Sequence, residues 1–107
     1  MPIRAVMAPS PSSAASNPTA TKTGTYTASS GEIVCYDASG GTFTVSAPAS
    51  HSDRALFTLK EVAGSPTAIT VDGNGANLDR AATMQFGVAD GSVTFQYSST
   101  QSRWLVL

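Results

Sequence analysis

Four adjacent residues, Ser50, His51, Ser52 and Asp53, have the side chains that a serine hydrolase uses. A working triad brings these groups together from separate elements, and consecutive residues rarely converge on one point. No Gly-x-Ser-x-Gly sequence surrounds a serine, and a Pro48-containing turn precedes the histidine. We therefore interpret His51 as a loop residue and expect no catalytic residues and no enzymatic activity.

The single cysteine offers a second possible nucleophile, with His51 as its base. Cys35 stands between Val34 and Tyr36 in an apolar run, which favours an inert, buried thiol. One cysteine also excludes an intrachain disulfide, and one histidine excludes the usual Cys/His zinc clusters.

The sequence DGNGANLD, Asp72 to Asp79, is rich in oxygen ligands and resembles a calcium loop. It departs from an EF-hand at the fifth position, where Ala76 stands, and at the twelfth, where Thr83 replaces the bidentate Glu. Hairpin turn chemistry explains the same residues, and no phosphate-binding loop occurs. We expect no metal and no cofactor, with calcium in this loop left open.

Charge is scarce in this 107-residue chain. Only 12% of residues are charged, against about 25% in average soluble domains. The six Lys and Arg residues are scattered and the net charge is -1, which argues against nucleic-acid and membrane-surface partners. No apolar run approaches the roughly 18 residues of a membrane span, so we expect a soluble product of the cytoplasm.

From Thr21 onward, β-branched and aromatic residues form short runs separated by turn residues about every ten positions, which predicts an all-β sandwich or barrel. The period-two pattern of Val93, Phe95 and Tyr97 is the clearest. Ala55, Phe57 and Leu59 are predicted to face inward. The expected strands are 32–37, 42–45, 55–62, 68–72, 83–86, 92–97 and 103–107, separated by turns at 39–41, 64–66, 72–75 and 90–91.

Residues 32–37 and 103–107 are apolar on both faces, so we expect both segments to be covered on two sides. The residues predicted to lie in the core or at a subunit interface are Tyr36, Phe95, Tyr97, Trp104 and Val106. Trp104 and the tyrosines at 26, 36 and 97 could also stack on a sugar or a base, but packing is the preferred interpretation.

The first twenty residues differ from the rest, with four prolines and one charge. We predict an extended arm at 1–20 and a β-structured body at 21–107. The residues expected to anchor the arm are Ile3, Arg4, Val6 and Met7, with Arg4 as the polar contact. The alternative is an arm folded back on its own body.

The chain resembles a β-structured module of tailed-bacteriophage virion proteins, found in head-fibre, decoration and tail-fibre proteins. The similarity runs from Gly24 to Leu107. Its most specific parts are D-x-S-G-G-x-F-T-V-x-x-P at 37–48, the Asp-Gly-Asn-Gly turn within 69–79, and the strand, turn and Trp strand of 92–104. The resemblance implies a virion structural protein that assembles as a homotrimer.

Short length favours a head decoration, or cement, protein on the outer capsid surface, with the major capsid protein as its partner. The expected fold is a small antiparallel β-sandwich or barrel, jelly-roll-like, with the arm extended from it. The alternative is a head-fibre or tail-fibre module that binds host-surface carbohydrate through Trp104, Tyr97 or Tyr26. Placement on the head, tail or neck stays open.

Overall fold

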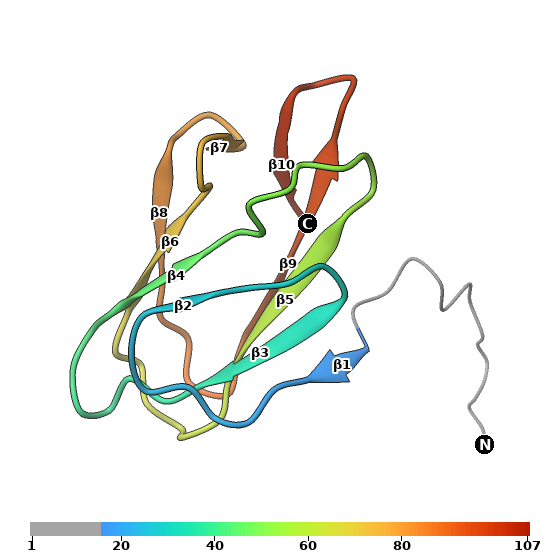
Figure 1. Ribbon diagram of the computed structural model, residues 1–107. Coiled ribbons are helices and arrows are strands. Elements are labelled where there is room, and N and C mark those ends of the chain that lie inside the picture. The colour runs from blue at the N-terminus through green and yellow to red at the C-terminus, as the bar shows by residue number, and fades with distance from the viewer. Residues whose placement is uncertain (1–15) are drawn as a thin grey trace, which may run out of the picture.

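The computed structural model describes residues 16–107, and all its regular elements are β-strands (Figure 1). The prediction of an all-β protein is confirmed. Within these residues no helix is long and apolar enough to cross a membrane. The strands are β1 (Asn17–Pro18), β2 (Tyr26–Thr27), β3 (Glu32–Tyr36), β4 (Thr44–Ser46), β5 (Leu56–Glu61), β6 (Ile69–Asp72), β7 (Asn77–Leu78), β8 (Thr83–Phe86), β9 (Ser92–Ser98) and β10 (Arg103–Val106).

The strands form two sheets, a larger sheet ordered β1-β3-β5-β9-β10-β7 and a smaller sheet ordered β2-β4-β6-β8. From β1 to β9 each strand belongs to the sheet opposite to that of its predecessor. Up to β6, the chain runs in the same direction each time it returns to a sheet. Strands β1, β3 and β5 therefore pair in parallel in the larger sheet, and β2, β4 and β6 do so in the smaller sheet.

The sheets are therefore mixed, and the expected purely antiparallel pairing is wrong. Antiparallel pairs join β5 to β9, β9 to β10, and β6 to β8, while β10 and β7 are parallel. Alternation along one strand shows which face is buried, but it carries no information about the direction of the neighbouring strand.

One hydrophobic cluster contains buried side chains from both sheets. Phe57 and Leu59 of β5 are fully buried, which confirms the inward face predicted for that strand, and Ile69 and Val71 of β6 are fully buried too. Burying a side chain of this size stabilises the fold by about 1.5–3 kcal/mol. The other fully buried members are Val34, Tyr36, Val45, Ala47, Phe95 and Trp104.

The turns lie where the sequence predicted them. Asn74 and Gly75, with φ of 55° and 97°, form the tip between β6 and β7, and Asp90, with φ of 57°, turns the chain into β9. Asn, Asp and Gly tolerate positive φ better than other residues. Residues 39–41 and 64–66 each contain a glycine of positive φ.

Several strand ends shift by one or two residues, β2 and β7 were not predicted, and the two ends of the chain differ from the prediction. Asn17 and Pro18, assigned to the arm, pair with β3, so the body includes at least residues 17–20. Leu107, expected to be covered, is 69% exposed within the single chain. The predicted arm contacts Ile3, Arg4, Val6 and Met7 lie outside the described residues.

Candidate functional site

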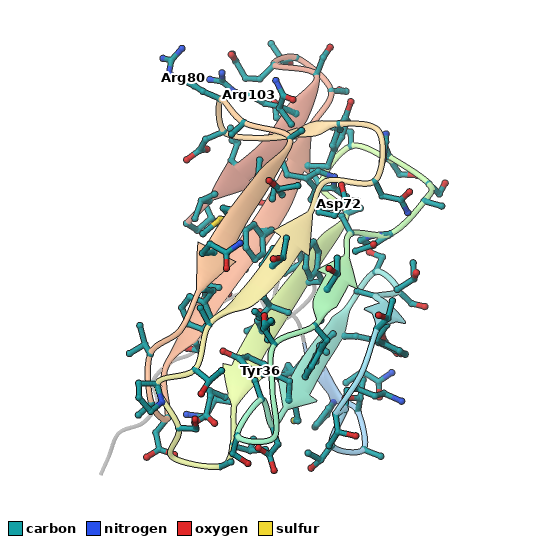
Figure 2. All side chains as sticks on the ribbon, turned by 90° about the vertical axis from the view of Figure 1, so that its left-hand side faces the viewer. Tyr36, Asp72, Arg80 and Arg103 are labelled. Atoms are coloured by element: carbon teal, nitrogen blue, oxygen red, sulfur yellow. The ribbon has the colours of Figure 1, made fainter. Side chains whose placement is uncertain are left out.

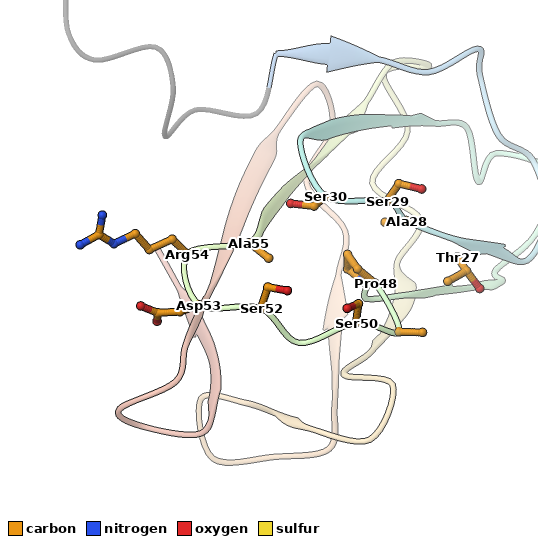
Figure 3. A pocket seen from close by; sticks show the side chains of 11 residues that line it. Thr27, Ala28, Ser29, Ser30, Pro48, Ser50, Ser52, Asp53, Arg54 and Ala55 are labelled. Carbon is orange, nitrogen blue, oxygen red and sulfur yellow. The ribbon is translucent and has the colours of Figure 1, made fainter.

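A pocket of about 720 Å³ lies between two connections that cross from the smaller to the larger sheet (Figure 3). One connection, residues 28–31, joins β2 to β3, and the other, residues 47–55, joins β4 to β5. Because β2 and β4 are parallel neighbours, both connections leave the same end of the smaller sheet. We call this cavity the loop pocket.

The lining of the loop pocket is small and mostly neutral. Hydroxyl groups come from Thr27, Ser29, Ser30, Ser50 and Ser52, and the remaining neutral lining residues are alanines and Pro48. Hydroxyls can both donate and accept hydrogen bonds. The pocket therefore suits a neutral polar group, such as a peptide backbone, that needs both kinds of partner.

Hydrogen bonds fix the walls of the loop pocket. Ser30 Oγ accepts the backbone N–H of Leu56 at 3.3 Å, and Gly31 donates its N–H to the Leu56 carbonyl at 2.6 Å. On the other wall, Asn74 donates from its side-chain amide to the Ala47 carbonyl at 2.9 Å. The two connections are thus tied to β5 and to the β6–β7 turn.

Two charged residues, Asp53 and Arg54, line one end of the pocket. Asp53 Oδ1 accepts the backbone N–H of Ser99 at 2.9 Å, and this bond, with a smaller effect from the nearby Arg54 charge, lowers the pKa of the Asp53 carboxyl. Arg54 has φ of 68°, a conformation that is strained for a non-glycine residue. Its N–H donates to the Tyr97 carbonyl at 2.9 Å, which holds it there.

His51 is a packing residue of this loop. Its Nε2 lies 3.0 Å from the carbonyl oxygen of Asn74. Its ring stacks on Tyr97 with centroids 5.3 Å apart and meets Trp104 at 6.1 Å nearly edge-on. Since His51 and Asp53 bond to backbone groups elsewhere, residues 50–53 do not form a Ser–His–Asp relay.

The other candidate groups are also engaged locally. Cys35 is half-buried, with Sγ 3.8 Å from the carbonyl of Ile33. Asp72 Oδ1 accepts the N–H of Asn74 at 3.0 Å, and Asp79 Oδ1 accepts the N–H of Val106 at 3.1 Å. The part of the chain that the structure describes contains no group of three or more His, Cys, Asp and Glu placed to hold a metal.

The residues predicted to lie in the core or at an interface divide into two groups. Tyr36, Phe95 and Trp104 are fully buried in the single chain, whereas Tyr97 and Val106 are half-buried and pack against the cluster. Figure 2 shows Tyr36 at the end of the molecule opposite to Arg80 and Arg103. Because Trp104 is fully buried in the single chain, its ring has no face free to stack on a sugar.

Glu61 is a structural residue that the sequence analysis did not identify. Its carboxylate is fully buried and accepts four backbone N–H groups, from Ala63, Gly64, Ser65 and Asp90, at 2.8–3.1 Å. These bonds, led by the one from Asp90, outweigh burial and lower the pKa of Glu61. One side chain therefore fastens both the β5–β6 and the β8–β9 connections.

The position of Glu61 could have been found from alternation, because it follows Phe57 and Leu59 at the same period on β5. Tyr36 lies beside it in the β3–β5 register. Burial, with a smaller effect from the Glu61 charge, raises the pKa of Tyr36 to about 12.

The strands and the loop pocket define an all-β protein with two mixed sheets. No protein-family model and no curated protein matches the chain. Among solved structures, one similar chain is described as "Structure of a chaperone-substrate complex", with 12% sequence identity and a TM-score of 0.48. The match covers 86% of this chain and 14% of that chain.

Proposed function

We propose that the protein is a virion structural protein of the head-decoration type, a β-sandwich that assembles as a homotrimer and binds the major capsid protein on the outer surface of a phage capsid. The observation that carries this proposal is the composition of the sheet edges. All four edge strands, β1, β2, β7 and β8, lack a charged residue. Monomeric β proteins commonly protect such edges with Lys, Glu or Pro.

Strand β8 is the longest of these edges. Thr83 and Gln85 are exposed, Met84 and Phe86 are half-buried, and within residues 16–107 no strand pairs with its outer side. By contrast, Pro18 in β1 lacks an N–H group and weakens pairing there. We therefore place the most favourable edge for contact between copies at β8.

Light scattering of the purified protein tests the trimer. Three chain masses are expected for the wild type, and a single chain mass for Thr83→Lys/Gln85→Lys, which puts two charges on the β8 edge. Ser92→Lys/Thr100→Lys, with equal charge added at exposed sites of β9 and the following turn, is the matched control and should stay trimeric. A wild-type monomer at micromolar concentration would refute the trimer.

Co-sedimentation with expanded capsids tests the partner. Since residues 17–18 belong to the larger sheet, the arm is altered only at its predicted contacts. Arg4→Glu should weaken co-sedimentation, while Arg80→Glu, the same charge change at an exposed residue of the body, should not. Equal binding by the two variants would show that Arg4 does not contact the capsid.

The alternative, a fibre module that binds host-surface carbohydrate, is less well supported. Trp104 is fully buried, and Tyr97 is half-buried with His51 stacked on its ring. The ring of Tyr26 has the Lys22 ammonium 4.3 Å from its centroid. None of the three proposed stacking rings is open on both faces.

A further inference from the structure

The loop pocket lies beside the point where the described chain begins. The backbone N–H groups of Ser16 and Asn17 both donate to the carbonyl of Gly31, at 3.0 and 3.1 Å. Gly31 follows Ser30, which lines the pocket. The chain that precedes residue 16 therefore starts within one residue of the pocket wall.

We propose that the loop pocket binds residues 3–7 of the same chain, with Arg4 placed against Asp53. The sequence of this segment is Ile-Arg-Ala-Val-Met. Docking onto the body and binding to a capsid are then competing uses of one segment, so this inference goes beyond the proposed function and can fail separately from it.

The tether length permits docking. Residues 8–15 link the segment to Ser16, and an extended chain spans about 3.3 Å per residue, or roughly 26 Å for this linker. The body measures 37 × 36 × 21 Å, so the linker can cross the 28–31 connection to the pocket. A short tether raises the effective concentration of a segment to about the millimolar range, enough to fill a weak site.

The lining complements the segment. Pockets of about 300–1,000 Å³ are typical of small-ligand sites, and this one has about 720 Å³. Ala28, Pro48 and Ala55 are buried and offer apolar contacts for Ile3 and Val6. The surrounding hydroxyls can satisfy the N–H and C=O groups of an extended backbone.

A pair of opposite charges fixes the position of the segment along the loop pocket. Arg4 is the only charged residue among the first twenty, and Asp53 is the only acidic residue that lines the pocket. Asp53 already accepts the Ser99 N–H at Oδ1, and its carboxylate carries the negative charge that Arg4 would meet. Figure 3 shows Asp53 and Arg54 at the same end of the pocket, with the Asp53 carboxylate and the Arg54 guanidinium both extended outward, away from Ser52 and Pro48, so Arg4 would meet Asp53 at the rim.

Disulfide trapping in the full-length chain tests the proposal. On a Cys35→Ser background, Ala5→Cys is combined with Ser52→Cys in the pocket or with Ser92→Cys on β9, an exposed control site away from the β8 edge. Under mild oxidation, the 5–52 pair should form an intramolecular disulfide about tenfold faster than the 5–92 pair. Equal rates, or cross-linked dimers in place of monomers, would overturn docking within one chain.

Charge variants test the Arg4–Asp53 contact in the same assay. Asp53→Asn retains an oxygen that can accept the Ser99 N–H but removes the negative charge, and Arg4→Gln removes its partner. Each should slow trapping of the 5–52 pair several-fold, and the double variant should be no slower than either single one. Far-UV circular dichroism verifies folding, and an unchanged rate in Asp53→Asn would overturn the Arg4–Asp53 contact.

Discussion

Trp104 is the residue whose replacement best tests the packing described here. It is fully buried, and its ring lies 5.3 Å from Phe57 and 5.4 Å from Tyr97 between centroids, both at steep angles. Its indole Nε1 is buried without a hydrogen-bond partner among the described residues. Ring packing therefore stabilises the fold at this position, whereas the N–H group lowers its stability.

The two effects predict different costs for two substitutions. Trp104→Ala removes the ring and leaves a cavity, at a cost of about 3–5 kcal/mol in the free energy of unfolding. Trp104→Phe keeps an aromatic ring, loses part of the buried area, and recovers about 1–3 kcal/mol by removing the unpaired N–H. The net cost of Trp104→Phe should therefore be about 1 kcal/mol or less.

Urea unfolding followed by far-UV circular dichroism measures both values, since Trp104 is the only tryptophan and its fluorescence is lost with it. With a slope of about 2 kcal/mol/M, Trp104→Ala should lower the midpoint by roughly 2 M and Trp104→Phe by about 0.5 M or less. A Phe variant as unstable as the Ala variant would refute the reasoning, because the indole N–H would then be stabilising.

Three further predictions concern other buried groups. Glu61→Gln should lower the urea midpoint near neutral pH. The difference from wild type should shrink as the pH falls below the ordinary Glu pKa of about 4.3 and then through the lowered pKa of Glu61 in the folded state. Gly73→Ala places a Cβ 1.8 Å from the Ala76 carbonyl oxygen, so it should cost about 3 kcal/mol or more, whereas Gly40→Ala meets no atom within 4 Å and should be neutral or slightly stabilising on urea unfolding. Because the pKa of Tyr36 is raised to about 12, stability should fall as pH rises above the ordinary value of about 10, and Tyr36→Phe should remove that part of the fall in alkaline unfolding curves.

The strands and their buried faces could be predicted because local alternation determines them. Phe57 and Leu59 lie inward on β5, and Phe95 is buried on β9 with Val93 and Tyr97 on its face, as the sequence indicated. The Asp-Gly-Asn-Gly turn follows from backbone preferences of the residues themselves. These features depend on a few neighbouring residues, which a single sequence contains.

The direction of pairing and the use of Glu61 depend on contacts between distant segments. The register that places Ile33 beside Thr58 arises from two crossings between sheets, and nothing within β3 or β5 specifies it. Alternation on β5 places Glu61 on the same face as Phe57 and Leu59, but it does not show which groups the buried carboxylate binds. Asp90, which donates to Glu61, lies 29 residues further along the chain.

The loop pocket is a consequence of the alternating path between the sheets. The neighbouring parallel strands β2 and β4 send their connections across at the same end. Residues 47–55 form a longer connection than residues 28–31, and small side chains such as Ser52 leave the space between the two connections unfilled. At the opposite end of β5, Glu61 binds the crossing segments tightly. One end of the body is thus fastened by a carboxylate, and the other end retains room for a ligand.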